Sequence, residues 1–180
     1  MPWRARDVRP LLSRRWAGRP LGGITVIPTS SSDDDTWRLL TKLFRSEVPE
    51  IASGVVEIRA VARKAGVGCK VAIYSHDRSI DGVGACVGPR ASRVQKVVEQ
   101  LGGERVDLFP WADSPDRLIS LALSPAKVED VVLDHSHRRA LVLVNEDQLS
   151  LASGRDGVNR ELAGQLTGWD IQLVTRKDAA

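Results

Sequence analysis

The stretch Val87-Gly88-Pro89-Arg90-Ala91 is followed by an amphipathic segment to Leu101 and by Gly102-Gly103-Glu104-Arg105-Val106-Asp107-Leu108. The same order returns as Ser153-Gly154-Arg155-Asp156-Gly157, a similar segment to Leu166, and Thr167-Gly168-Trp169-Asp170-Ile171-Gln172-Leu173. Each copy predicts a tight glycine turn, a helix, a glycine stop and a strand. Glycine at such a turn leaves backbone N–H groups uncovered, which close approach of a nucleic-acid backbone requires. The repeat therefore predicts two related units with an RNA-binding surface.

Composition is typical of a globular protein. The chain has 180 residues, room for one ordinary domain or two small ones, with 42% hydrophobic and 27% charged residues. Aromatic content is only 4%, which argues against reading single strands mainly by stacking. No segment reaches the roughly 18 apolar residues of a membrane span, and no apolar signal-peptide core is present at the N-terminus. We expect a cytoplasmic protein without membrane attachment.

The net charge of +3 is unevenly distributed. Residues 1–20 carry six arginines against Asp7 alone, whereas the remainder carries slightly more acidic than basic side chains. The basic character therefore belongs to an arm rich in Arg, Pro and Gly, which we place at residues 1–33. Any phosphate affinity in the rest of the chain must come from the local placement of cations.

Hydrophobic spacing predicts an α+β fold in two modules, each a small sheet packed on helices. A connecting helix is expected over 34–46, and a second helix from Pro49 to Gly66, because apolar residues recur there at helical spacing. Ser124-Pro125 predicts the boundary between a first module within 34–125 and a second over 126–180. Further strands are expected at 70–75, 105–109, 127–133, 139–144 and 170–174, a short turn or helix at 82–87, and further helices at 92–101, 115–123, 147–152 and 158–166.

Several strings of residues, in this order, resemble the tandem KH region of the bacterial transcription factor family NusA. They are Glu47-Val48-Pro49-Glu50-Ile51, Val56-Glu57-Ile58, Gly84-Ala85-Cys86-Val87-Gly88-Pro89-Arg90, Ala122-Leu123-Ser124-Pro125-Ala126, Gln148-Leu149-Ser150-Leu151-Ala152 and Leu166-Thr167-Gly168-Trp169. The resemblance implies two tandem KH modules of the prokaryotic type that bind single-stranded RNA. It also implies a role in transcription elongation, termination or antitermination.

The resemblance extends to partners and to missing parts. It implies the nascent transcript as RNA ligand, and RNA polymerase and other elongation factors as protein partners, of a chain expected to be monomeric. The family's polymerase-docking domain and OB-type barrel are not matched. We interpret residues 1–33, with a strand at Ile24–Ile27, as the remnant of such a barrel, in either a truncated paralogue or a fragment.

The two turns and the cations after them are the candidate RNA contacts, because backbone amides and basic side chains bind phosphates without reading sequence. The alternative for the cations is an ordinary solvated helix face. The candidates are Gly88, Pro89, Arg90, Ala91, Arg93 and Lys96 in the first module, and Gly154, Arg155, Asp156, Gly157 and Arg160 in the second.

Three residues depart from the family pattern at these turns. Ala91 replaces the second glycine, where a Cβ costs about 1–2 kcal/mol if φ is positive. Ser153 replaces a branched apolar residue, and Asp156 places a carboxylate where phosphate is expected, a repulsion of up to about 4 kcal/mol before salt screening. These departures favour a competing hypothesis, a degenerate KH module that binds proteins and has little RNA affinity. A third hypothesis assigns non-specific nucleic-acid affinity to the arm.

No pattern predicts catalysis, a cofactor or a metal site. Gly82 and Gly84 lack the strand–helix context of a nucleotide fingerprint, and no Walker loop or Ser-His-Asp arrangement is present. His135 and His137 lack further ligands at metal-binding spacing. Cys69 and Cys86 are expected to be reduced, half-buried thiols. We therefore expect a protein that is not an enzyme.

Overall fold

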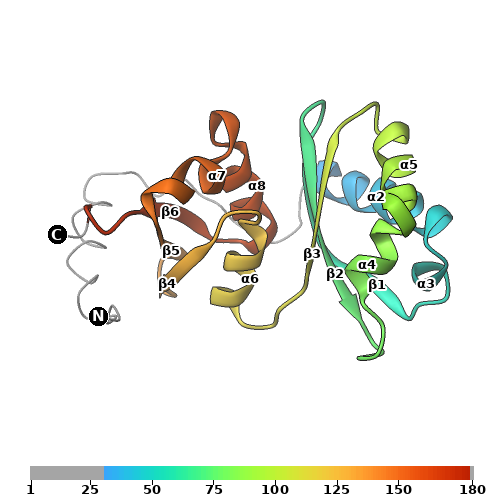
Figure 1. The fold of residues 1–180 in the computed structure, drawn as a ribbon, viewed down its shortest axis with the longest axis horizontal. Helices are drawn as coiled ribbons and strands as arrows, with labels where there is room; N and C mark the ends of the chain where they lie inside the picture. Colours follow the sequence, from blue (N-terminus) through green and yellow to red (C-terminus); the bar gives the residue numbers. More distant parts are fainter. Residues whose placement is uncertain (1–30, 179–180) are drawn as a thin grey trace. The chain divides into compact units, whose positions relative to one another are not determined.

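The computed structural model describes residues 31–178, with side chains from residue 34 onward. The predicted arm and the strand at 24–27 lie outside the described residues, except that residues 31–33 begin a helix. The chain forms two compact units that separate between Asp113 and Ser114. Each unit is a sheet packed on helices, which confirms the predicted α+β fold (Figure 1).

The first unit has its helices on one face of a three-stranded sheet (Figure 1). The sheet order is β1-β2-β3, with β1 and β2 antiparallel and β2 and β3 parallel. Its core includes Phe44, Val71 and Val97, all fully buried. The elements are α2 (Ser31–Glu47), α3 (Pro49–Ala52), β1 (Val56–Lys64), β2 (Gly68–Ser75), α4 (Gly82–Val87), α5 (Ser92–Gln100) and β3 (Arg105–Pro110).

The second unit repeats this plan. Its sheet order is β4-β5-β6, again with an antiparallel pair followed by a parallel pair. In both units the middle strand leads through two helices, joined by a glycine turn, to the parallel edge strand. The elements are α6 (Pro115–Ala122), β4 (Val128–Asp134), β5 (Arg139–Val144), α7 (Leu149–Ser153), α8 (Val158–Thr167) and β6 (Asp170–Val174).

The predicted helix over 49–66 is wrong beyond its first turn. Gly54 has a φ of 81°, which ends α3, and the chain continues as β1. The register of β1 against β2 shifts between Ile58 and Ala60. This bulge brings Val61 to the core that also receives Val56 and Ile58. The inward residues therefore recur at unequal intervals that imitate helical spacing.

The helix α6 belongs to the second unit, although the predicted boundary placed it in the first module. It contacts α8 and β4, and Leu118, Ile119 and Ala122 are its buried residues. The helix therefore stands before β4 as α3 stands before β1. Ser124-Pro125, a cis peptide, lies between α6 and β4 and within the unit.

One carboxylate joins the β1–β2 turn to the start of β3. Glu104 accepts two hydrogen bonds from the Arg63 guanidinium, at 2.8 and 2.7 Å, and one from the Gly66 N–H at 2.8 Å. The bond from Arg63 is the main cause that lowers the pKa of Glu104 below its usual value. Because the carboxylate is favoured in the folded state, its contribution to stability is present above the unfolded pKa and is lost as pH falls through the folded one.

Glu104→Gln should lower the free energy of unfolding at pH 7 by about 1–3 kcal/mol, because Arg63 and Gly66 lose an ionised acceptor. The deficit should shrink toward zero as the pH falls below the folded pKa of Glu104. Urea unfolding of both proteins from pH 7 to pH 3 measures this. Glu99→Gln, at an exposed position of α5, is the matched control. A deficit of equal size at all pH values would contradict the prediction.

The two thiols should be inert in the folded protein. Cys69 and Cys86 lie in the core of the first unit, and burial is the main cause that raises the pKa of each to about 12. Because the thiolate is the reactive form, a disulfide reagent at pH 8 should label them only as fast as the unit opens. Absorbance of the released thiol measures the rate, and the chain in denaturant is the control. Immediate labelling of the native protein would contradict this prediction.

Candidate nucleic-acid interface

The two glycine turns have the same backbone conformation. The first residue is extended with positive φ: φ and ψ are 73° and 171° at Gly88, and 74° and 170° at Gly154. The third and fourth residues are left-handed in both turns, with φ between 53° and 76°. In each turn the fourth N–H donates to the first carbonyl at 3.1 Å. The repeat predicted from the sequence is therefore also a repeat of backbone conformation.

The first glycine of each turn is required by space as well as by φ. A Cβ built at Gly88 would lie 2.6 Å from Cγ of Arg93, and one built at Gly154 would lie 2.7 Å from the backbone nitrogen of Asn159. The helix after each turn therefore packs directly against the glycine. Any side chain at either position would force the two helices apart.

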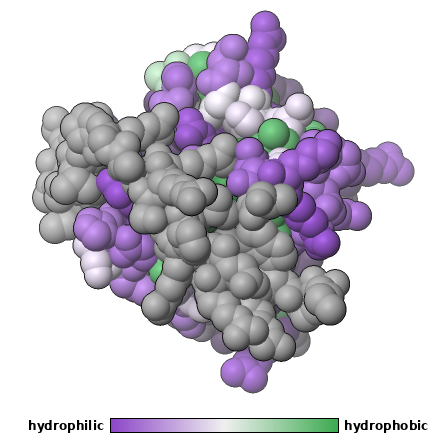
Figure 2. Space-filling model, turned by 90° about the vertical axis from the view of Figure 1, so that its left-hand side faces the viewer, coloured by the Kyte–Doolittle hydropathy of each residue, from purple (hydrophilic) through white to green (hydrophobic). Residues whose placement is uncertain are grey.

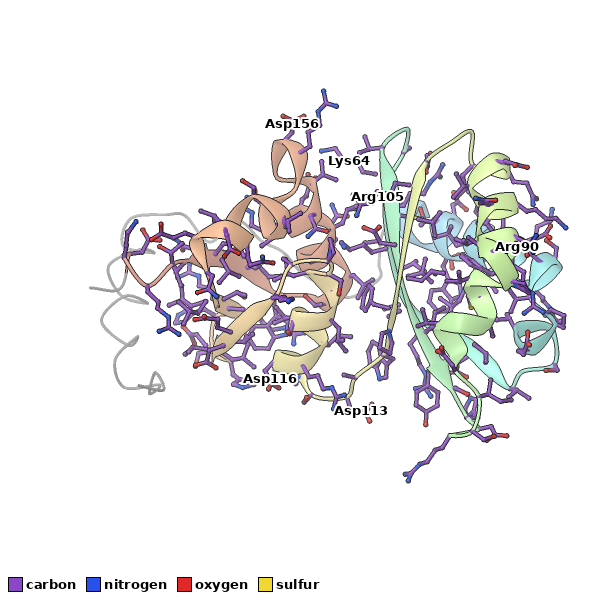
Figure 3. All side chains as sticks on the ribbon, viewed as in Figure 1. Lys64, Arg90, Arg105, Asp113, Asp116 and Asp156 are labelled. Carbon is purple, nitrogen blue, oxygen red and sulfur yellow. The ribbon has the colours of Figure 1, made fainter. Side chains whose placement is uncertain are left out.

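The middle of each turn is exposed. Pro89 and Arg90 are exposed in the first turn, and the side chains of Arg155 and Asp156 in the second are 97% and 88% exposed. The residues that precede α5 and α8, Ala91 and Gly157, make no side-chain hydrogen bond to the helix start. The turn with Asp156 forms a projecting tip in Figure 3. The first amide of each helix donates to a carbonyl of the turn, Ser92 to Pro89 and Val158 to Arg155. The amides that follow are not capped by the side chain of the preceding residue, as binding of an anion requires.

In the first module the three predicted cations have different environments. Arg90 makes no ion pair with any residue from 34 to 178, and it lies on the helical side of its sheet (Figure 3). The Lys96 side chain is 63% exposed, with its Nζ 3.5 Å from the Glu47 carboxylate. Arg93 is directed back into the module. Its Nη1 lies 2.9 Å from the Glu50 carboxylate and donates to the Ala85 carbonyl at 2.8 Å.

The second turn carries the opposite charge at the same backbone position. Asp156, with φ and ψ of 54° and 22°, occupies the third position, where the first turn has Arg90 at 53° and 33°. The Arg155 guanidinium lies 3.9 Å from the Asp156 carboxylate, so the turn is neutral overall. Arg160 is exposed and donates to the Ile171 carbonyl at 3.3 Å. The two turns therefore present one backbone and two different electrostatic surfaces.

Comparison with known proteins gives the family. Residues 35–111 match the NusA-like first KH domain, and residues 115–180 match the NusA-like second KH domain. The chain contains a NusA-like tandem KH region. The boundary between these matches agrees with the separation of the two units at Asp113 and Ser114, and the second match includes α6.

Relatives of this tandem KH region come from several organisms. The transcription termination/antitermination protein NusA of Bacillus subtilis is 45% identical over 141 residues, 78% of this chain and 38% of the relative. NusA of Mycobacterium bovis is 49% identical over 136 residues, 75% of this chain and 39% of that one. NusA of Thermus thermophilus is 48% identical over 136 residues, 76% of this chain and 35% of its own length. The chain thus spans little more than a third of these relatives.

A solved structure agrees on the fold. The crystal structure of APE1850 matches with a TM-score of 0.54 over 77% of this chain and 96% of that chain, at 19% sequence identity.

Two further observations concern residues 31–178 of this chain. None of their helices is long and apolar enough to cross a membrane, and they contain no group of three potential metal ligands.

The left-handed fourth position predicts opposite effects for two substitutions. Ala91→Gly should raise the free energy of unfolding by about 0.5–1 kcal/mol, because relief of the strained φ exceeds the added entropy of the unfolded chain. Gly157→Ala should lower it by a similar amount, since a Cβ there would touch nothing within 4 Å and only φ is strained. Urea unfolding of both variants checks this. Two changes of the same sign would show that the turns differ in conformation.

Proposed function

We propose that this chain binds single-stranded RNA through the two glycine turns of its NusA-like KH modules and thereby modulates transcription elongation, termination or antitermination. One observation carries the proposal: two exposed turns of closely similar backbone conformation, in which the residue before the next helix provides no side-chain cap. Backbone N–H groups there suit phosphate oxygens. The names of the relatives, which are termination/antitermination proteins, support the nascent transcript as ligand and the polymerase machinery as partner.

The first turn is the stronger phosphate site in this proposal. Arg90 adds a charge with no competing carboxylate in the described part of the chain, whereas Asp156 places a negative charge at the same point of the second turn. Because Asp156 is 88% exposed, water and salt weaken its effect. At ~4 Å in a water-like dielectric the repulsion is about 1 kcal/mol, roughly a five-fold change in Kd.

A second candidate is a KH module that binds protein instead of RNA. Asp156 favours it, and so do Leu149 and Leu151, which flank Ser150 directly before the second turn and are 37% and 47% exposed. Val67 is the other large apolar residue exposed in the described part of the chain, at 46%. On the face shown in Figure 2, the residues drawn in colour are mainly hydrophilic.

A salt titration tests the proposal. A short unstructured RNA is titrated with the full chain at several KCl concentrations. Arg90→Ala should weaken binding and reduce the slope of log K against log salt by about 0.7, the value for one lost phosphate contact on a single strand. Arg78→Ala removes an exposed arginine from the loop between β2 and α4 of the same module and should leave the slope unchanged. Asp156→Asn should strengthen binding roughly five-fold.

Each hypothesis has its own outcome. Absence of RNA binding by the wild-type chain at low salt would favour the protein-binding module. Replacement of the six arginines of residues 1–20 by glutamine, in the full chain, tests the arm. Loss of binding in that variant, together with an Arg90→Ala variant that binds normally, would assign the affinity to the arm.

A further inference from the structure

We propose that Arg93 and Asn159 are matched positioning residues that hold the two turns in their RNA-binding geometry. The inference rests on the proposed RNA-binding function and assigns Arg93 a role other than direct phosphate contact. Its basis is a set of hydrogen bonds that recurs in both modules although the side chains differ.

The two residues occupy equivalent positions. Arg93 is the fifth residue after Gly88, and Asn159 is the fifth residue after Gly154. Arg93 donates from Nη1 to the carbonyl of Ala85 at 2.8 Å. Asn159 donates from Nδ2 to the carbonyl of Leu151 at 3.1 Å. Both carbonyls belong to the third residue before the first glycine, so the same link across the turn is built twice.

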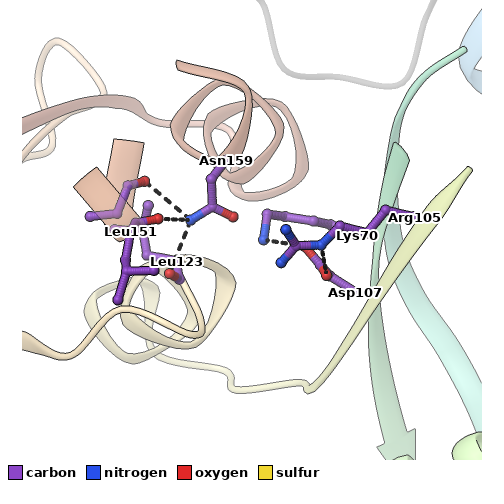
Figure 4. Close-up of polar contacts among 7 residues, drawn as sticks. Lys70, Arg105, Asp107, Leu123, Leu151 and Asn159 are labelled. Atoms are coloured by element: carbon purple, nitrogen blue, oxygen red, sulfur yellow. Dashed lines mark hydrogen bonds and ion pairs between the residues drawn. The ribbon is translucent and has the colours of Figure 1, made fainter. Parts of the chain in front are cut away.

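Each side chain also reaches the segment that precedes the first strand of its module. Arg93 pairs with Glu50 of α3 at 2.9 Å. The Nδ2 of Asn159 also lies 3.1 Å from the carbonyl of Leu123, the residue directly after α6, and 3.1 Å from that of Ala152, so its two hydrogens are shared among three carbonyls (Figure 4). Each residue therefore joins three segments: the helix before the turn, the helix after it and the segment that precedes the first strand of the module.

The turns need these hydrogen bonds to keep their conformation. The helices before them, α4 and α7, have only six and five residues, too few to be stable alone. Two consecutive left-handed residues then follow in each turn. Gly88 packs against Arg93, and Gly154 packs against Asn159. A Cβ placed at either glycine would lie 2.6 Å from a side-chain carbon of that residue. A turn without these hydrogen bonds would spend only part of the time in the geometry that presents its amides, and apparent affinity falls by that fraction.

The low exposure of Asn159 and Arg93 distinguishes a positioning role from direct contact with RNA. Asn159 is only 9% exposed, so its amide is not available to RNA. The Arg93 side chain is 28% exposed and already engaged by Glu50. If Arg93 were a phosphate ligand restrained by Glu50, removing that carboxylate would free a cation and strengthen RNA binding. If Arg93 positions the turn, removing its partner weakens RNA binding although a negative charge is lost.

The test uses the full chain and the RNA titration described above. Glu50→Ala should weaken binding roughly ten-fold, as expected if only a tenth of the molecules keep the competent turn, with an unchanged salt slope. Glu47→Ala removes a carboxylate that faces Lys96 in the same module, and it should leave binding equal or stronger. Asn159→Ala should also weaken binding at an unchanged slope. Gln165→Ala, at an exposed amide of the same helix, should have no effect.

The outcomes distinguish the inference from the function on which it rests. Affinities are measured under conditions where urea unfolding shows each variant folded, and Glu50→Ala still tests the inference if Asn159→Ala does not fold. Stronger binding by Glu50→Ala, or a salt slope reduced by about 0.7 in Arg93→Gln, would overturn positioning by Arg93 while leaving RNA binding in place. Unchanged affinity of a folded Asn159→Ala variant would overturn the pairing. A wild-type chain that binds no RNA would overturn both proposals.

Discussion

The two turns depend on the contact between a glycine and the helix that follows it. At Gly88 and Gly154 the first turn of the next helix approaches so closely that a Cβ would lie 2.6 Å from a heavy atom. This contact sets the angle between the short helix before the turn and the longer helix after it. The positive φ of the glycine and the left-handed third and fourth residues allow the chain to bend at that angle. The middle strands and parallel edge strands then fix where the two helices begin and end.

The two turns share this backbone conformation, but their side chains differ. Arg90 and Asp156 have nearly the same dihedral angles and opposite charges. Asp is the easier residue to place in the left-handed region, whereas Arg and Ala at the corresponding points of the first turn are strained. The first turn thus accepts strain and presents a positive charge, and the second is more relaxed and neutral. Under the proposed function, the module with the more strained turn contributes more of the phosphate affinity.

Local signals in the sequence predicted most of the fold. Strand 139–144 and strand 170–174 are confirmed at both ends, and the glycine turns lie where the repeat placed them. The helix predicted over 49–66 failed because a bulge in β1 gives a strand the apolar spacing of a helix. The position of α6 in the second unit followed from contacts with α8 and β4, which are distant in sequence. Local spacing carries no information on such contacts.

The sequence predicted the part of the candidate site that the backbone forms, namely the two glycine turns. It did not predict the directions of the side chains beside them. The sequence places Arg93 on the helix directly after the first turn, yet a carbonyl of the preceding helix and a carboxylate of α3 draw its guanidinium inward. Asn159 gave no signal by itself, because a single amide near a turn is ordinary. Alignment of the two glycine turns would have placed it opposite Arg93, and two different donors at one repeated position indicate a shared acceptor. In this repeated fold, Arg93 and Asn159 identify a hydrogen bond that both backbones need. Arg90 and Asp156 instead identify a backbone position at which the charge can differ between the two modules.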